Sequence, residues 1–204
     1  EREARHLNRC GFFGRNLSED ELQKEMVNGG MINYTVSALR MAKKANAVSK
    51  LHAKVAKDMW KDYPGTCNIT PITNAQNQNF WQDKTIKRTW ERKQIKAYQK
   101  RKLELKQELF NEVALQTNKK MDPNVLTFVW ARRFAGYKRA DLLLHDLQRF
   151  ERLISNEKYP VQIIWAGKPY PYDFYAIDIF NHLVNYSKPK SNLAVLVGYE
   201  IELS

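Results

Sequence analysis

The sequence has little of what marks secreted, membrane or metal-binding proteins. Its two cysteines, Cys10 and Cys67, are too few for a disulfide framework, and they lack the spacing of metal ligands. None of its four histidines has a ligand partner at suitable spacing, so no metal site is predicted. No apolar run reaches the roughly 18 residues of a membrane span, and the first residues, EREARHLNRC, do not form a secretory signal. These absences predict a cytoplasmic protein with reduced thiols.

Acidic residues are the minority, since 34 lysines and arginines against 22 aspartates and glutamates give a net charge of +12. Clustered cations of this kind are typical of nucleic-acid binding. Much of the charge, however, falls in Lys84–Lys106, a predicted helix in which Glu91 and Glu104 interleave with the bases, as on a solvated helix face. The helix also lacks an aromatic stacking platform. We therefore predict no nucleic-acid partner, although a basic nucleic-acid-binding or non-catalytic domain stays the alternative from another class.

The first part of the chain is predicted to be mostly helical. Ser18 followed by Glu21 forms the pattern of a helix start, in which each side chain caps the other's backbone. From Ile32 to Trp60 the apolar residues recur at helical spacing, which predicts one helical stretch with a buried face. The residues of this face are Val36, Leu39, Ala42, Val48, Leu51, Val55 and Met59.

The second part alternates between apolar runs and helical patterns. A charged helix or helix pair is expected first, and three apolar runs typical of buried strands follow, with a helix after each of the first two. This alternation predicts an α/β fold with a Rossmann-like parallel sheet and flanking helices. The predicted elements are helix 85–116, strand 125–130, helix 138–155, strand 161–166, helix 172–186 and strand 193–197.

Parallel strands present their carboxyl ends at one edge, where open sheets bind ligands. The first strand ends in Arg132 and Arg133, and Lys138 and Arg139 follow at the expected helix start. Arginine offers a planar fork and lysine a mobile charge to phosphate, and a helix N-terminus adds backbone donors. The other two strand ends are Gly167-Lys168-Pro169 and Gly198-Tyr199-Glu200. The pattern predicts an anion site at the first strand end.

An amide-rich run, Asn74-Ala75-Gln76-Asn77-Gln78-Asn79, lies between the two parts. Amide side chains donate and accept hydrogen bonds without charge, which suits a hydroxyl-rich ligand. A plain surface loop is the alternative interpretation.

The stretch Arg133-Phe134-Ala135-Gly136-Tyr137-Lys138-Arg139 resembles the strand end of the α-glucan phosphorylases, where an arginine and a three-residue spacer precede Tyr-Lys-Arg. Four further blocks resemble the same family in the same order. Ala75-Gln76-Asn77 departs from the usual Gly-Val-His or Gly-Ile-Thr, and Gly136 stands where threonine or glutamate is common. The four blocks are KKANAVSKLHAKVAKDMW (43–60), ITNAQNQNFW (72–81), VQIIWAGKPYP (161–171) and VLVGYEIELS (195–204).

The resemblance implies a two-domain glycosyltransferase of the GT-B type, in which two Rossmann-like domains face each other across a cleft. Residues 1–80 would be the end of the N-terminal, glucan-side domain, and residues 81–204 the incomplete start of the C-terminal, phosphate- and cofactor-side domain. The implied enzyme uses orthophosphate to release glucose 1-phosphate, with retention, from the end of glycogen, starch or maltodextrin. Its partners would be the α-1,4-glucan and orthophosphate, and the full-length enzyme is expected to be a homo-oligomer. A nucleotide-sugar glycosyltransferase similar to glycogen synthase is the alternative enzyme.

The resemblance also implies a role for particular residues. Arg133 and Lys138 would be the catalytic residues that hold the substrate phosphate and the phosphate of a pyridoxal 5′-phosphate cofactor. Tyr137, Asn74 and Lys168 would bind the substrate. The cofactor's Schiff-base lysine would lie in a block downstream of Ser204. We therefore expect the isolated piece to be inactive.

Overall fold

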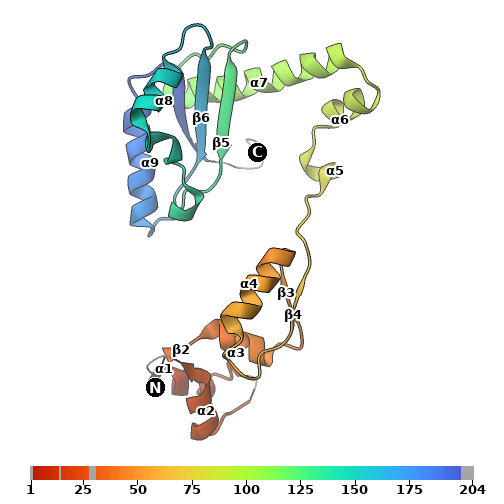
Figure 1. The fold of residues 1–204 in the computed structure, drawn as a ribbon, viewed down its shortest axis with the longest axis vertical. Helices are drawn as coiled ribbons and strands as arrows, with labels where there is room; N and C mark the ends of the chain where they lie inside the picture. The colour runs from red at the N-terminus through yellow and green to blue at the C-terminus, as the bar shows by residue number, and fades with distance from the viewer. Residues whose placement is uncertain (1, 14, 28–30, 199–204) are drawn as a thin grey trace. The chain divides into compact units, whose positions relative to one another are not determined.

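The computed structural model describes residues 2–13, 15–27 and 31–198, and it divides the chain into two compact units, residues 1–76 and 77–204 (Figure 1). Within the described residues no helix is both long and apolar enough to cross a bilayer.

The first unit consists of short helices and very short strands. The predicted cap is present at the start of α2 (Glu19–Glu25), because the Ser18 hydroxyl accepts from the Glu21 amide at 3.3 Å and the Glu21 carboxylate accepts from the Ser18 amide at 2.9 Å. Arg15 donates to the same carboxylate at 2.6 Å. The elements are α1 (Arg2–Arg9), α2 (Glu19–Glu25), β1 (Met26–Val27), β2 (Met31–Ile32), α3 (Tyr34–Met41), β3 (Ala45–Ala47), α4 (Lys50–Trp60) and β4 (Ile69–Pro71).

The helical stretch predicted from Ile32 to Trp60 is wrong in two respects. Strand β3 interrupts it, because the chain extends between α3 and α4 and pairs in parallel with β4. Helix α4 then starts at the Ser49 cap, whose hydroxyl accepts from the His52 amide at 3.0 Å. The buried face of α4 is also a different one, since alanines rather than the larger apolar residues pack on the β3–β4 pair. This core consists of Ala47, Ala53, Ala56 and Ile69.

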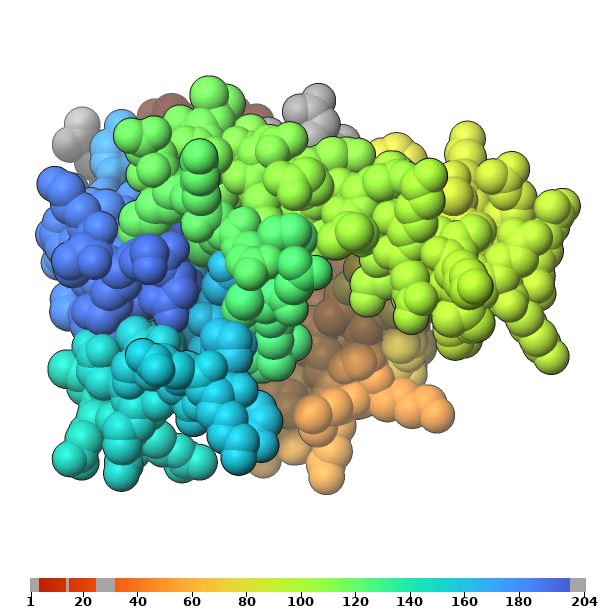
Figure 2. Space-filling model, turned by 90° about the horizontal axis from the view of Figure 1, so that it is seen from above, coloured from red at the N-terminus to blue at the C-terminus, as the bar shows by residue number. Residues whose placement is uncertain are grey.

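The second unit opens with short helices and one long helix. The predicted charged segment is a helix pair, broken where Lys93 adopts a positive φ of 55°. In Figure 2 the yellow-green side chains of α6 and of the first turns of α7 project beyond the rest of this unit. The elements are α5 (Gln78–Trp81), α6 (Lys84–Glu91), α7 (Ile95–Thr117), β5 (Leu126–Ala131), η1 (Gly136–Lys138), η2 (Leu142–Leu144), α8 (Leu147–Ile154), β6 (Val161–Gly167), α9 (Phe174–Ser187) and β7 (Leu193–Val197).

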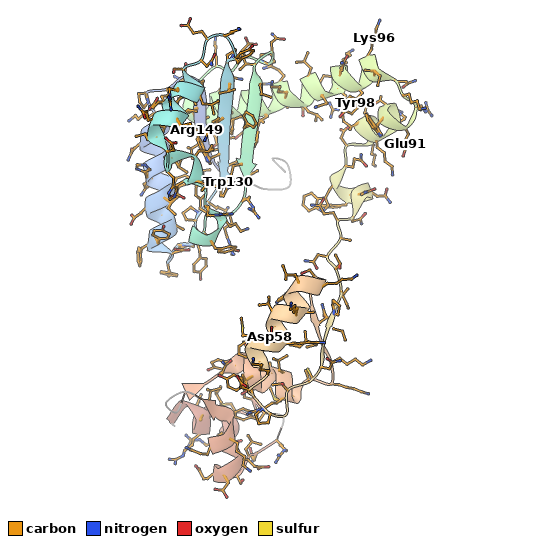
Figure 3. All side chains as sticks on the ribbon, viewed as in Figure 1. Asp58, Glu91, Lys96, Tyr98, Trp130 and Arg149 are labelled. Carbon is orange, nitrogen blue, oxygen red and sulfur yellow. The ribbon has the colours of Figure 1, made fainter. Side chains whose placement is uncertain are left out.

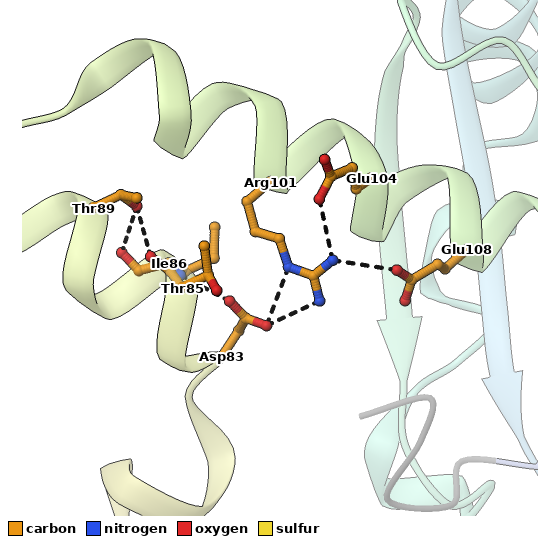
Figure 4. A network of polar contacts seen from close by, with 7 residues as sticks. All are labelled: Asp83, Thr85, Ile86, Thr89, Arg101, Glu104 and Glu108. Atoms are coloured by element: carbon orange, nitrogen blue, oxygen red, sulfur yellow. Dashed lines mark hydrogen bonds and ion pairs between the residues drawn. The ribbon is translucent and has the colours of Figure 1, made fainter.

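Arg101 ties the two helices of this pair together (Figure 4). Its guanidinium donates to Asp83 at 3.0 Å and to Glu104 and Glu108 at 3.3 Å each. Asp83 also caps α6, since its other oxygen accepts from the Ile86 amide at 2.7 Å. The Arg101 hydrogen bond holds the pKa of the Asp83 carboxyl below its usual range. Part of the charge that suggested nucleic acid is therefore used within the fold.

The three predicted strands form one parallel sheet in the order β5-β6-β7, which confirms the α/β class (Figure 1). Helix α7 covers one face through Phe110 and Val113. Helices α8 and α9 cover the other face, where Trp165 and Leu183 are almost fully buried. Strand β6 is buried along its whole length, as predicted.

Strand β5 does not fit the expectation of burial on both faces. It is an edge strand of the sheet formed by the described residues, and its side chains are exposed or half-buried. Leu126 is 59% exposed and Phe128 52% exposed. The apolar run therefore predicted the strand correctly, but it did not predict that the strand lies at the sheet edge with exposed side chains.

Lys119 fastens the connection between α7 and β5 to the end of α9. Its ammonium group donates to the carbonyl oxygens of Ser187, Lys190 and Leu193 at 2.6, 2.9 and 2.8 Å. All three donors of the lysine are thereby used. Burial lowers the pKa of this amine.

Candidate anion-binding site

The carboxyl ends of β5, β6 and β7 meet at one edge of the sheet, as the sequence predicted. Backbone hydrogen bonds continue past the strands, from the Arg132 amide to Ala166 at 3.0 Å and from the Phe134 amide to Lys168 at 3.2 Å. The Gly198 amide donates to Gly167 at 3.2 Å. The structure thus brings Arg133 and Lys168, two of the predicted site residues, onto adjacent strand ends. The remainder of the third strand end, Tyr199 and Glu200, lies outside the described residues.

Gly167 allows the first two strand ends to approach this closely. A Cβ atom at this position would clash with the carbonyl oxygen of Arg132 and would lie 3.1 Å from the Phe134 ring. The sequence alone gave no reason to prefer this glycine over any other turn glycine. The structure shows that it holds the loop with Arg133 against the β6 end.

Tyr137 and Lys138 lie on a tight turn rather than at the start of an α-helix. The helix predicted for residues 138–155 is wrong over its first half. The chain forms the short 3₁₀ turns η1 and η2, and α8 begins only at Leu147. Asp141 and Asp146 divide the segment, because short acidic side chains prefer capping positions to helix interiors. Asp146 indeed caps α8 by accepting from the Arg149 amide at 3.0 Å.

This correction changes how an anion is bound at the site. The dipole of an α-helix does not begin at Lys138, so the attraction depends on side chains and on turn amides. The turn ends with Arg139 in the left-handed conformation at φ 51°. The Lys138 ammonium group stands 5.8 Å from the centre of the Tyr137 ring.

Four cations on the loop and turn after β5 are not neutralised by the part of the chain that the structure describes. No ion pair there involves Arg132, Arg133, Lys138 or Arg139. The three arginines are exposed and Lys138 is half-buried. Four cations within eight consecutive residues repel one another, and an anion between them relieves that repulsion.

A cavity of about 350 Å³ lies beside the turn. Its floor is apolar, and Trp130, on β5 in Figure 3, forms part of it. Arg132, Lys138 and Arg139 supply the polar part of its lining. Trp165 is fixed at the base, because its indole nitrogen donates to the Ala140 carbonyl at 2.9 Å. The cavity therefore offers an apolar surface next to positively charged side chains, which suits a flat or ring-shaped group that carries an anion.

Asn74, the remaining predicted site residue, belongs to the first unit. Its backbone amide donates to Val48 at 3.0 Å, which extends the pairing of β3 and β4. The whole amide-rich run 74–79 is exposed, and Asn77 caps the short helix α5.

Two kinds of site residue escaped the sequence analysis. The aromatic residues Phe128 and Trp165 line the cavity, although their positions in apolar strands indicated only core packing. Tyr175 contacts the turn at Gly136 from α9, a sequence separation that no local pattern reveals. The apolar pattern of the strands was a weak sequence signal for Phe128 and Trp165, and no sequence signal pointed to Tyr175.

Comparison with known proteins supports an enzyme class for this parallel-sheet fold. No family model matches the chain. The chain is 31% identical over 204 residues to the maltodextrin phosphorylase of Thermococcus litoralis, a match that covers 81% of the chain and 24% of that protein. It is 28% identical over 200 residues to the glycogen phosphorylase of Aquifex aeolicus, covering 76% of the chain and 28% of that enzyme. An uncharacterized protein of Methanocaldococcus jannaschii is 44% identical over 198 residues, covering 97% of the chain and 37% of that protein.

The parallel sheet and the similarity to these phosphorylases together imply a GT-B-like domain for the α/β unit. More particularly, the chain is a distant homologue of the glycogen and maltodextrin phosphorylases, as the sequence motifs indicated. It spans between 24% and 37% of the lengths of the relatives described above.

Proposed function

We propose that the chain is a part of an α-1,4-glucan phosphorylase, in which it supplies the residues that hold phosphate. The observation that carries the proposal is the set of unpaired cations on the loop and turn after β5, in a chain homologous to enzymes of this class. The proposed reaction transfers the terminal glucosyl unit of the glucan to orthophosphate and releases glucose 1-phosphate. Unit 77–204 would form the phosphate side of the site, and the first unit would belong to the glucan side.

The proposed roles follow from the chemistry of the side chains. Arg133 offers a planar fork to two phosphate oxygens, and Lys138 a mobile charge from the turn. Positive charge held in place before the reaction stabilises the anion as the bond to the sugar breaks. Tyr137, 75% exposed beside Lys138, is available for a hydrogen bond to the glucosyl unit. We assign Lys168 to the substrate as well, from its position on the adjacent strand end, and Asn74 from the first unit.

The residues at this edge also fit pyridoxal 5′-phosphate, the cofactor that the family resemblance implies. Lys138 lines the cavity and matches a phosphate group, and the apolar floor with Trp130 matches a flat ring. Arg133 lies on the same loop but outside the cavity lining, and it would hold the phosphate from there. When bound, this cofactor supplies a second phosphate beside the substrate phosphate. Arg132 and Arg139 then balance part of the added negative charge.

Charge reversal at Lys138 tests the proposal in the full-length protein that contains this chain. Lys138→Glu should lower phosphate-dependent release of glucose 1-phosphate from maltodextrin by at least roughly a hundredfold, because it replaces attraction to the phosphate by repulsion. Lys100→Glu, on the exposed side of α7, makes the same charge change away from the site and should leave turnover unchanged. Near-normal turnover of Lys138→Glu would refute the phosphate role.

The second enzyme candidate is a nucleotide-sugar glycosyltransferase, which has the same kind of fold and a basic strand end but uses no pyridoxal phosphate. The full-length protein distinguishes the two. A phosphorylase requires orthophosphate for activity and shows the absorbance of its bound pyridoxal phosphate. A nucleotide-sugar glycosyltransferase instead transfers glucose from a nucleotide sugar and lacks that absorbance. We propose a cytoplasmic, homo-oligomeric enzyme in either case.

A further inference from the structure

The turn that carries Tyr137 and Lys138 has an unusual neighbour at Gly136. An ideal Cβ atom built on this glycine would lie 2.8 Å from Cε1 and 3.0 Å from Cδ1 of the Tyr175 ring. Among the described residues, setting aside those next to Gly136 in the chain, no other group comes within 4 Å of that point. The ring of Tyr175 therefore occupies the space that a side chain at position 136 would need.

The base of Tyr175 is firmly held. The next residue on α9, Ala176, is fully buried, and its amide donates to the Asp173 carboxylate at 3.0 Å. One turn further, Phe180 meets Phe134 edge to face with ring centres 5.0 Å apart. The first turn of α9 is thus packed against the loop that leads into Gly136. The tyrosine ring itself is 65% exposed, so its contact with the turn, and not burial in the core, accounts for its position.

The two ends of the turn are held by hydrogen bonds, from the Phe134 amide to Lys168 at 3.2 Å before it and from the Trp165 indole to Ala140 at 2.9 Å after it. Between these ends the turn has only short local hydrogen bonds, from the Lys138 amide to Ala135 at 2.9 Å, from the Arg139 amide to Gly136 at 3.0 Å and from the Leu142 amide to Arg139 at 3.2 Å. A glycine at its start leaves the backbone more freedom than any other residue would. The Tyr175 ring, which packs against this glycine, limits the backbone conformations of the turn, as a side chain at position 136 would otherwise do.

We propose that Tyr175 is a positioning residue of the anion site, and that it sets the direction of Lys138 by packing on Gly136. This inference rests on the proposed function for the identity of the anion, but the contact itself does not. It also makes the two positions dependent on each other, because a side chain at 136 requires the Tyr175 ring to shift.

A double-mutant cycle in the full-length protein that contains this chain tests the coupling. The variants are Gly136→Ala, Tyr175→Ala and the combination of both, read by the amide NMR signals of residues 137–139 and by titration with inorganic phosphate. Each single variant should move these signals and weaken phosphate binding by roughly fivefold, and the double variant should be no worse than either single one, since contacting residues are not additive. Tyr175→Phe keeps the ring and should behave as the native chain does.

Phe174→Ala is the matched control, because Phe174 is the neighbouring exposed aromatic residue and does not meet Gly136. Unchanged amide signals of α7 verify that each variant is folded. The inference is overturned if Tyr175→Ala leaves the turn signals in place, or if the two substitutions add. If the native chain shows no saturable response to phosphate, the proposed phosphate role fails, and the amide signals still decide the role of Tyr175.

Discussion

Helices α4 and α9 have similar apolar patterns but opposite burial. On α4 the residues at successive turns, Leu51, Val55 and Met59, are 71%, 48% and 58% exposed. On α9 the corresponding apolar residues, Ile179 and Leu183, are buried against the sheet. The difference lies in the partner and not in the helix. The spacing of apolar residues identifies the apolar face of a helix, but it does not reveal which other element, if any, packs on that face.

The cores beneath these two helices differ accordingly. Alanines make most of the contact between α4 and the β3–β4 pair, whereas Trp165, Leu183 and Leu193 fill the space between α9 and a three-stranded sheet. Buried apolar area stabilises a fold by about 25 cal/mol per Å². We therefore expect the unit of residues 77–204 to be the more stable of the two. The predictions below test this difference.

The largest effect is expected from Trp165→Ala, which should destabilise the second unit by about 4 kcal/mol because it leaves a large cavity in a packed core. It also removes the hydrogen bond to Ala140. Hydrogen exchange followed by mass spectrometry reports each unit separately, and peptides from residues 1–76 should keep their native protection. Equal loss of protection in both units would contradict the assignment of independent cores.

A smaller loss, about 2 to 3 kcal/mol, is expected from Lys119→Met. The methionine has a similar length, but it removes the ammonium donor from the carbonyl groups of Ser187, Lys190 and Leu193. The first two of these carbonyls keep only one backbone donor each. Urea unfolding monitored by the protection of β7 measures the change. Lys120→Met, one residue further along at an exposed position, is the control and should alter the stability by no more than about 0.5 kcal/mol.

Leu51→Ala should have almost no effect, within about 0.5 kcal/mol, because Leu51 is largely exposed and an alanine suits a helix well. Ala53→Leu on the buried face of the same helix should destabilise the first unit by about 1 to 3 kcal/mol through overpacking. Thermal unfolding followed by circular dichroism compares the two. If Leu51→Ala proved the more harmful, the observed orientation of α4 would be wrong.

The smallest expected effect concerns acid pH in the first unit. The hydrogen bonds from Arg15 and from the Ser18 amide lower the pKa of Glu21 from 4.5 to about 2. Because the folded-state pKa is depressed, the contribution of Glu21 to stability is present above pH 4.5 and is lost as the pH falls towards 2. Carbon-13 NMR titration of the carboxyl group measures this directly. Arg15→Gln should bring the pKa back towards its ordinary value, and no change in that variant would remove Arg15 as the cause.

Much of the sheet was predictable from the sequence, because a buried parallel strand needs a run of apolar residues whatever its surroundings. Strand β6 and strand β7 follow from that requirement, and α9 from its helical spacing and its Asp173 cap. The segment 138–155 was not predictable to the same degree. There Leu143 keeps helical spacing with Leu147 and Phe150, while Asp141 and Asp146 favour turns, and tertiary packing decides between the two.

The site divides in the same way. The positions of Arg133, Lys138 and Lys168 near the sheet edge were predictable, because residues that follow parallel strands meet at one edge, whereas their roles stay predictions. The reason for Gly167 was not predictable, since it depends on the distance between two loops that are far apart in sequence. Tyr175 belongs to the same group, because its relation to Gly136 exists only after α9 has packed against the sheet.

The long helix α7 has a mechanical consequence. With 23 residues it is about 35 Å long, and the residues that anchor it to the sheet, Phe110 and Val113, lie in its second half. Its first half carries α6 through Arg101. A continuous hydrogen-bonded helix resists bending, so α7 is a rigid element that is attached to the sheet through its second half. A displacement of α6 would therefore rotate α7 against the face of the sheet that contains Ile164 and Leu196.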